Sequence, residues 1–261
     1  MTGPVAVTAR PTRSGAPLAR RTPVAKIVAL ALFTTAALLT RDVAALGFAL
    51  AVTFLAAPLF GITPWGLLRR GWPALLGAGT VVLSLALFAA DRSGTVLFAA
   101  GPLVITTTVL LNALSLALRL LAIALPSVLV FSTTDPTDLA DSLIQHARVS
   151  PRFAIGALAA FRLVGLLGDE WQMIAMARRA RGIDAGRNPL RWLRLFASTA
   201  FGLLVGAIRR GTRLAVAMDA RGFDAGLPRT VARPMPWQAA DWLLVAAGAA
   251  LAAAIQLIAH R

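Results

Sequence analysis

Two short segments of the chain are nearly identical. Residues 180–186 read ARGIDAG, and residues 220–226 read ARGFDAG. A guanidinium is planar and always charged, so an arginine held in such a segment suits a socket of carboxylates and backbone carbonyl groups on another protein. Two copies predict two sockets, and therefore a dimeric or pseudo-dimeric partner.

The arginine of each segment ends a stripe of residues spaced at i, i+3, i+4 and i+7, as on one face of a helix. The stripes are Ile174, Ala177, Arg178 and Arg181, and Leu214, Ala217, Met218 and Arg221. The glycine that follows, Gly182 or Gly222, suits the left-handed conformation in which many helices end. Asp184 and Asp224 begin the exits from the two helices. For a single copy, the alternative is that arginine only complements the negative end of its own helix.

A group of three carboxylates is the other candidate for chemistry. Asp135, Asp138 and Asp141 are three residues apart, a spacing at which carboxylates can hold Mg²⁺ and a diphosphate, as in membrane prenyltransferases. The sequence has no second cluster of this kind, and Pro136 favours the start of a helix. Helix capping is therefore the preferred interpretation.

The remaining polar residues are not accompanied by the partner residues that a catalytic site needs. His146 and His260 are far apart in sequence, and we expect His146 at a helix end. Asp169 and Glu170 are expected to pair with nearby arginines. Lys26 is the only lysine, and there is no phosphate-binding loop of the form GxxxxGK[ST]. We expect no catalytic residue, no metal site, no cofactor and no ATP binding of that kind.

The elements that hold these residues are predicted to be membrane helices. Of 261 residues, 58% are hydrophobic and 14% are charged, with a mean hydropathy of +0.75. Soluble domains have about 25% charged residues, so we predict an all-α, polytopic helical membrane protein. The 26 Lys and Arg residues against 11 Asp and Glu residues indicate contact with anionic lipid rather than nucleic acid. The absence of cysteine excludes disulfides and thiolate metal sites.

Apolar runs predict five transmembrane helices, four within residues 24–131 and one within residues 237–261, after a cytoplasmic tail of residues 1–23. The expected spans are 24–40, 43–60, about 74–90, one from near Val96 to about Leu118, and about 242–258. We expect the chain to change direction between Arg119 and Pro126, because proline fits poorly inside a helix. The excess of arginine predicts that residues 132–236 are cytoplasmic.

Residues 132–236 are predicted to form the helices that carry the two repeated segments. The first begins with Thr134 or Asp135 as its cap. Two helices of about thirty residues follow, one from Ser150–Pro151 to Gly182 and one from Asn188–Pro189 to Gly222.

These two helices have apolar stretches, 154–168 and 195–208, that are short for spans. We place them at or just below the cytoplasmic membrane face, and a sixth and seventh span is the alternative. Small residues one turn apart would let the two helices cross closely. They are Gly156 with Ala160 and Gly202 with Gly206.

Four features together indicate a family. They are PLARRTPVAK before the first span, LLRRGWP after the second, Arg119 followed by STTDPTDLADSL, and the two helices that end in ARG. With these features the chain resembles the T component, the transmembrane coupling subunit, of energy-coupling factor (ECF) transporters of the cobalt/biotin-type permease family. The resemblance implies a non-catalytic subunit of the cell membrane. It would link an ATP-binding cassette ATPase dimer, which hydrolyses ATP, to a substrate-binding S component for uptake of vitamins or transition metals.

By this resemblance, docking into the ATPases belongs to Ala180, Arg181, Gly182, Ala220, Arg221 and Gly222. Possible support for coupling comes from Arg178, Asp184, Asp224 and Arg119. The first copy has Arg-Arg where the second has Met-Asp, so the two sockets need not be equivalent. Two other functions stay open at this stage. One is a stand-alone secondary transporter or channel, and the other is a membrane enzyme of the prenyltransferase type.

Overall fold

The chain divides into two units. The computed structural model describes residues 16–88, 93–100, 103–186, 188–223, 231 and 233–260. Within these residues, the bundle unit comprises the chain up to Arg148 together with Met235 onward, and the helix-pair unit comprises Val149–Pro234. Residues 1–15 of the predicted tail and Asp224 lie outside the described residues.

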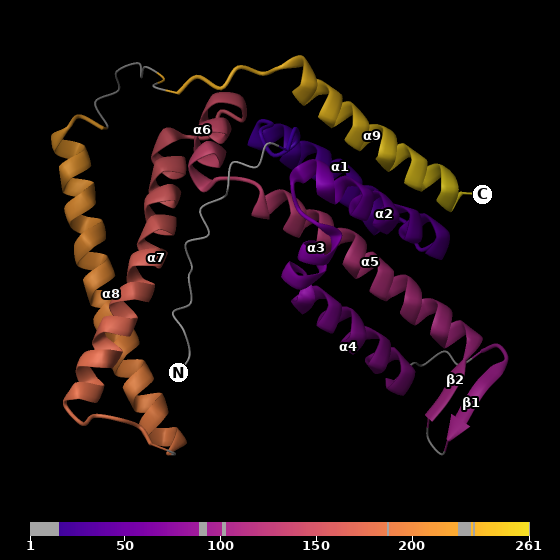
Figure 1. Ribbon diagram of the computed structural model, residues 1–261, viewed down its shortest axis with the longest axis horizontal. Helices are drawn as coiled ribbons and strands as arrows, with labels where there is room; N and C mark the ends of the chain where they lie inside the picture. The colour runs from indigo at the N-terminus through magenta and orange to yellow at the C-terminus, as the bar shows by residue number, and fades with distance from the viewer. Residues whose placement is uncertain are drawn as a thin grey trace. The chain divides into compact units, whose positions relative to one another are not determined.

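Seven α-helices and one hairpin form the described part of the bundle unit (Figure 1). The helices are α1 (Pro23–Leu39), α2 (Val43–Ala56), α3 (Pro64–Arg70), α4 (Trp72–Phe88), α5 (Thr107–Ser132), α6 (Pro136–His146) and α9 (Ala239–Ala259). A 3-10 turn, Ala57–Phe60, extends α2, and strands β1 (Val96–Ala100) and β2 (Leu103–Thr106) pair antiparallel before α5. The predicted first, second, third and last spans match α1, α2, α4 and α9 closely.

Local capping explains where the helices begin. Asp42 accepts a hydrogen bond from the Ala45 N–H at 2.8 Å and so starts α2. Asp135 accepts one from the Thr137 N–H at 2.7 Å, with Pro136 as the first residue of α6. Each carboxylate satisfies an N–H group that the first turn of a helix leaves free. The capping interpretation of Asp135 is confirmed.

α1 and α9 run parallel to each other. The Thr22 N–H donates to Asp241 Oδ1 at 3.1 Å where the two helices begin. Gln256 Nε2 donates to the Ala36 carbonyl oxygen at 3.0 Å near their ends. Two contacts of this kind fix both the direction and the register of the pair.

The apolar core of the bundle lies among α1, α2, α3, α5 and α9. Its largest fully buried apolar side chains include Leu46, Leu67, Leu125 and Ile255. Gly248 of α9 lies against Ala29 of α1, where an added Cβ would be only 2.9 Å from the Ala29 Cα. The two helices can approach this closely because residue 248 has no side chain.

The predicted fourth span is wrong at its start. Val96–Ala100 and Leu103–Thr106 form the paired strands β1 and β2, and α5 begins only at Thr107. The run TVLFAAGPLVIT is rich in β-branched residues and interrupted by Gly-Pro. These are features of two strands and a turn, which hydropathy alone does not distinguish from an apolar helix.

The predicted change of direction between Arg119 and Pro126 is also wrong, because α5 continues through both residues. Arg119 Nη2 donates to the Thr40 carbonyl oxygen at 2.7 Å. Ser115 Oγ donates to the Arg41 carbonyl oxygen at 2.6 Å. The turn between α1 and α2 thus supplies acceptors for polar side chains of α5, and the helix can carry a charged residue without breaking.

The directions of the helices alternate as membrane spans require. α2 returns along α1 after a short turn, and α5 runs antiparallel to α1, since Lys26 near the start of α1 bonds Thr133 just after α5. α4 runs opposite to α5, because Gly71 before α4 lies against Leu125 near the end of α5. α1, α4 and α9 therefore run one way, and α2 and α5 run the other.

Among the described residues, five helices are long and apolar enough to cross a membrane. They are α2 with its 3-10 extension, α5, α9 and the two helices of the other unit, Pro151–Ala180 and Pro189–Ala220. α3 and α4 meet the same test together, as a pair bent by 68°. The predicted total of five agrees, but its members differ. The helices Pro151–Ala180 and Pro189–Ala220, which we expected at the membrane face, meet the test of length and composition, whereas α1, with 17 residues, does not and α4 does so only together with α3. The chain is a membrane protein with multiple apolar helices.

Candidate functional site: two helix tips and the clamps between them

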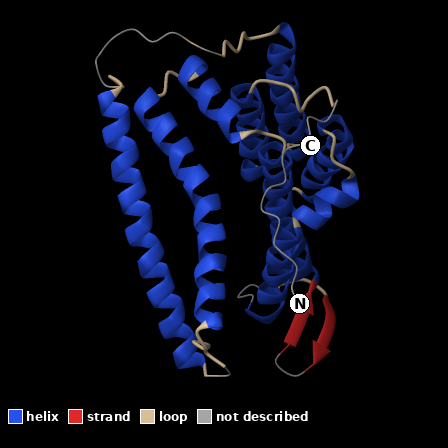
Figure 2. Ribbon diagram, turned by 60° about the vertical axis from the view of Figure 1, so that its left-hand side comes forward, coloured by secondary structure: helices blue, strands red, loops and turns tan. Residues whose placement is uncertain are grey.

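The helix-pair unit consists of two long antiparallel helices, α7 (Pro151–Ala180) and α8 (Pro189–Ala220), as Figures 1 and 2 show. Each has proline as its first residue, and Asn188 caps α8 by accepting from the Leu190 N–H at 3.0 Å. Both helices begin and end where the sequence predicts. The two repeated segments therefore lie at the C-terminal tips of two helices that point in opposite directions.

Arg178 clamps α7 to the first part of α8. Its Nη1 atom donates to the Leu195 carbonyl oxygen at 3.1 Å, and to Ser198 Oγ and Thr199 Oγ1 at 2.8 Å each. Charge-assisted hydrogen bonds of this kind are stronger than those between neutral groups. Arg178 is thus occupied within the unit, and its contribution to any docking is to hold the two helices together.

A second clamp joins the middle parts of the two helices. Arg210 of α8 donates to Glu170 of α7 in an ion pair that lies beside Gly206. The predicted pairing of Glu170 with an arginine is confirmed. Trp171 of α7 also packs against Phe196 of α8, with ring centroids 5.1 Å apart.

The two tips are far apart along the helix pair, as their distances from the Glu170–Arg210 ion pair show. Arg181 lies 11 residues after Glu170, and Arg221 lies 11 residues after Arg210, in the opposite direction. At a rise of 1.5 Å per residue, the two arginines are roughly 33 Å apart along the pair. An antiparallel pair of this kind has an approximate two-fold axis between its halves, and this axis relates one tip to the other.

The first tip ends in a Schellman motif. Arg181 is the C-cap with φ −89°, and Gly182 follows with φ +73°. The Gly182 N–H donates to the Arg179 carbonyl oxygen and the Ile183 N–H to the Arg178 carbonyl oxygen, both at 2.9 Å. Gly182 is required here because other residues rarely adopt a positive φ of this size.

The second tip has the same backbone geometry. Arg221 is the C-cap with φ −90°, and Gly222 has φ +70°. The Gly222 N–H donates to the Asp219 carbonyl oxygen at 2.9 Å, and the Phe223 N–H donates to the Met218 carbonyl oxygen at 3.0 Å. The repeated sequence therefore corresponds to a repeated structure.

Both tip arginines are exposed. Within the described part of the chain, neither the Arg181 nor the Arg221 guanidinium has a hydrogen bond or ion pair, and Ala180 and Ala220 beside them are exposed as well. Main-chain bonds, and not the arginine side chains, cap the two helices. The guanidinium groups are consequently available to another molecule.

The other residues predicted to support the site have different roles. Asp184 accepts a hydrogen bond from the Ala185 N–H at 2.7 Å and shapes the exit from α7. Arg119 belongs to the bundle unit, where it bonds the α1–α2 turn. The predicted close approach of the two helices does not occur at Gly156 or Gly202, where an added Cβ would meet nothing within 4 Å, whereas at Gly206 it would lie 3.8 Å from Glu170 Oε1 of α7. Of the four residues predicted to support coupling, Arg178 and Asp184 lie next to the first tip in sequence, Arg119 belongs to the bundle unit, and Asp224 lies outside the described residues.

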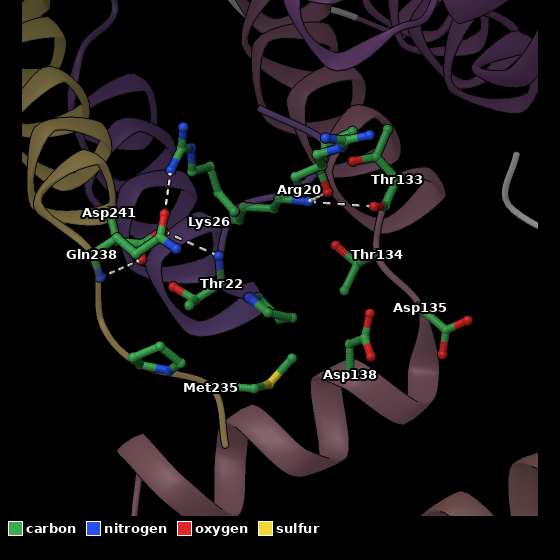
Figure 3. Close-up of a pocket in the computed structure, with 14 residues that line it drawn as sticks. Arg20, Thr22, Lys26, Thr133, Thr134, Asp135, Asp138, Met235, Gln238 and Asp241 are labelled. Atoms are coloured by element: carbon green, nitrogen blue, oxygen red, sulfur yellow. Dashed lines mark hydrogen bonds between the residues drawn. The ribbon is translucent and has the colours of Figure 1, made fainter. Parts of the chain in front are cut away.

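Sequence reasoning missed a polar junction in the bundle unit, shown in Figure 3. Lys26 is 2% exposed, and its Nζ donates to the carbonyl oxygens of Ala19 at 2.8 Å and Thr133 at 3.3 Å. Asp241, 1% exposed, accepts from the Thr22 N–H. The signal was present, because the only lysine of the chain lies inside an apolar run, where a charged group needs partners. These residues border a cavity of about 190 Å³.

The segment that carries the helix pair leaves and re-enters the bundle unit at one place. His146 Nε2 lies 2.9 Å from the Met235 carbonyl oxygen, and Gln145 Oε1 accepts from the Met235 N–H at 2.9 Å. His146 also packs edge-on against Trp237, which contacts Trp242. His146 is the last residue of α6, as predicted.

A bundle of apolar helices, together with a pair of long apolar helices that end in exposed arginines, defines a multi-span membrane protein. Its family follows from sequence comparison. The pattern of the cobalt transport protein family, CbiQ, matches residues 14–231. The chain belongs to this family.

Individual relatives agree with this assignment. The chain is 34% identical over 162 residues to the energy-coupling factor transporter transmembrane protein EcfT of Leuconostoc gelidum. This match covers 58% of the chain and 60% of the relative. It is 36% identical over 181 residues to EcfT of Lacticaseibacillus paracasei, with 66% of each protein covered. The match to EcfT of Streptococcus equi has 29% identity and covers 69% of the chain and 70% of that protein.

Proposed function

We propose that the chain is the non-catalytic transmembrane coupling subunit of an ATP-driven ECF-type importer in the cell membrane. One observation carries the proposal. Two exposed arginines end antiparallel helices with the same backbone geometry, roughly 33 Å apart. The names of the relatives, energy-coupling factor transporter transmembrane proteins, support this role.

The partner of the tips is an ATP-binding cassette ATPase dimer. A dimer with a two-fold axis presents two sockets that face each other across that axis. The helix pair has a matching approximate axis, so each tip can enter one socket. In each socket the guanidinium of Arg181 or Arg221 meets carboxylate or carbonyl oxygens, which its planar donors fit.

The clamps between α7 and α8 allow the helix pair to transmit a movement from one tip to the other helix. When ATP binding moves the two sockets relative to each other, it acts on both tips at once. Because Arg178 and the Glu170–Arg210 ion pair tie the helices together, a displacement of one tip is passed to the other helix. The chain itself supplies no ATP hydrolysis, in line with its lack of a phosphate-binding loop.

The bundle unit is the partner of lipid and of a substrate-binding S component. Large apolar side chains are exposed on α1, α2 and α9, among them Leu39 at 72%, Leu55 at 78% and Leu243 at 72%. Surfaces of this kind suit the bilayer and another apolar membrane protein. Substrate choice, a vitamin or a transition metal, belongs to the S component. The N-terminus and residues 132–236 are on the cytoplasmic side, where the excess of arginine favours them.

Purification of the tagged chain from its own cells tests this function. We expect an ATPase pair and a second small membrane protein to copurify with it, and ATP hydrolysis to be absent from the chain purified alone. The chain alone, reconstituted in liposomes, should not move vitamins or metal ions. If it does so without any partner, the chain is a stand-alone transporter and the proposal is wrong.

A further inference from the structure

The short helix α3 lies across the direction of the membrane spans. It is separated from α4 by Gly71 alone, and the two helices are bent by 68° (Figure 1). α4 packs along α5, which is long and apolar enough to cross a membrane. Because membrane helices tilt by only about 20° on average, α3 lies closer to the plane of the bilayer than to its normal.

Packing holds α3 in this position. Leu67 of α3 is fully buried and belongs to the core of the bundle, together with Ile62 just before the helix. Gly71 lies so close to α5 that an added Cβ would be 2.5 Å from Leu125 Cδ2. With Leu67 turned to the core, the opposite face of α3 is turned outward.

Two tryptophans and two arginines are exposed on and beside this outward face. Trp65 is 75% exposed and Trp72 is 58% exposed. Arg69 and Arg70 are exposed, and within the described part of the chain neither guanidinium has a hydrogen bond or ion pair. Trp65 and Arg69 are four residues apart and therefore share a face of the helix. Tryptophan suits the headgroup level of a membrane, where its ring has apolar neighbours and its N–H polar ones.

The elements around α3 do not neutralise the two arginines. Arg69 and Arg70 are the only charged residues between Asp42 and Asp91. The elements that pack chiefly on α3 are α4, α5 and the 3-10 turn at Ala57–Phe60, and none of them contains an acidic residue. An anion that pairs with the arginines therefore comes from another molecule.

An apolar surface continues from the arginines along α4. Its exposed side chains include Leu76 and Leu83, each at 60%, and Phe88 at 79%. A surface that is cationic at one end and apolar along its length matches a phospholipid, whose phosphate lies next to its acyl chains. A water-soluble acidic partner would match the arginines only.

We propose that α3 and α4 form a binding surface for an anionic phospholipid. Arg69 and Arg70 bind the lipid phosphate, which their planar donors fit. Trp65 and Trp72 lie at the headgroup level, and the acyl chains lie along α4. The lipid thereby fixes the depth of this end of the bundle in the membrane. Its place in the cytoplasmic leaflet, which carries negative charge, rests on the orientation given in the proposed function.

Lipid binding by the purified full-length chain tests this surface. Phosphatidylglycerol is the anionic probe, and phosphatidylcholine with the same acyl chains is the neutral reference. Each is titrated in detergent, and the rise in melting temperature reports binding. We expect phosphatidylglycerol to act at the lower concentration. Arg69→Gln with Arg70→Gln should raise the phosphatidylglycerol concentration required by roughly 5- to 30-fold, because two positive charges near the anionic lipid are lost. Lysine at both positions keeps the charge and should keep most of the preference.

Arg191→Gln with Arg194→Gln is the matched control. These arginines of α8 are exposed on either side of Trp192, and the change removes the same charge. The control should keep the preference for phosphatidylglycerol. An equal loss in the control, or equal stabilisation of the unaltered chain by both lipids, would overturn the proposal. If the unaltered chain shows no lipid preference and the Arg69 and Arg70 variant instead loses a copurifying protein, the surface belongs to that protein.

The side of the membrane is tested separately. The chain has no cysteine, so Arg70→Cys provides a single thiol on this surface. We expect a membrane-impermeant maleimide to label it only after the cells are permeabilised. Labelling in intact cells would overturn the cytoplasmic leaflet and the orientation in the proposed function, whereas the lipid preference of the purified chain would stand. Copurification of the ATPases with the unaltered chain tests docking independently of either result.

Discussion

Replacing Arg181 and Arg221 by alanine is the most direct test of the helix tips. Within the chain the cost is small. Neither guanidinium has a partner among the described residues, and the caps depend on main-chain bonds to Gly182 and Gly222, which alanine leaves in place. Loss of a positive charge at the helix end is worth about 0.3–1 kcal/mol. The helix pair should therefore stay folded in both variants.

In the complex the cost is much larger. An arginine that is desolvated in a socket leaves its partner oxygens unpaired when it is removed, at about 2–5 kcal/mol for each tip. This corresponds to roughly 30- to 5,000-fold weaker binding. The tips are roughly 33 Å apart along the pair, so the two effects should add.

Copurification of the ATPases, titrated by ATPase concentration, measures this loss alongside a thermal melt of the purified chain. We expect intermediate loss for each single variant, near-complete loss for Arg181→Ala with Arg221→Ala, and an unchanged melt. Arg162→Ala is the matched control. If the double variant keeps the ATPases bound and substrate uptake at the normal rate, each arginine serves only its own helix and the reasoning fails.

Three further predictions concern the clamps and the bundle. Arg178→Met should loosen α7 from α8 and lower substrate uptake more than ATPase binding. The loss of its charged hydrogen bonds should weaken the contact between the two helices by at most about 1.5–3 kcal/mol, because Arg178 is partly exposed. Distances between spin labels near the two tips should then show a broader distribution, and an unchanged distribution would contradict this prediction. Gly47→Leu should weaken S-component copurification without unfolding the chain, since an added Cβ meets nothing within 4 Å at that residue. Gly248→Leu should instead destabilise the bundle by separating α9 from Ala29, so equal loss of folding in both glycine variants would argue against a distinct docking face.

The tips were predictable because their signals are local. Proline after Asn188, glycine at positions 182 and 222, and Asp135 before Pro136 determine where helices start and stop from a few neighbouring residues. The pairing of Glu170 was predictable for a different reason: its partner Arg210 is 40 residues away in sequence, but arginines are abundant on both long helices. What lies within one or two helical turns can be read from the sequence.

The errors concern contacts between distant segments. The run before Thr107 is apolar enough for a span, and only strand pairing distinguishes it from one. We expected Arg119 to interrupt its helix. It does not, because it bonds the Thr40 carbonyl oxygen, an acceptor in a turn 79 residues earlier that the sequence does not reveal. The bonds from Arg178 to α8, which include one to Ser198, could not be read from the sequence, and its support of docking stays a prediction. Sequence spacing places a residue on a helix face without showing what that face will meet.

The distribution of buried polar groups in the bundle bears on how substrate crosses the membrane. Among the described residues, Lys26, Ser142 and Asp241 are buried where α1 and α9 begin, while Thr40 and Ser115 are buried where α1 ends. The core between these two levels is made of side chains such as Leu46 and Ile255.

A carrier that works alone needs polar groups near the middle of its spans to hold a hydrophilic substrate. Thr53, a buried polar residue of α2, uses its hydroxyl to bond its own helix at Ala49. The polar groups of the bundle instead join helix ends to one another, as Lys26 does between Ala19 and Thr133. Under the proposed function, a bundle tied at its ends and apolar between them fits a chain that leaves substrate binding to a partner.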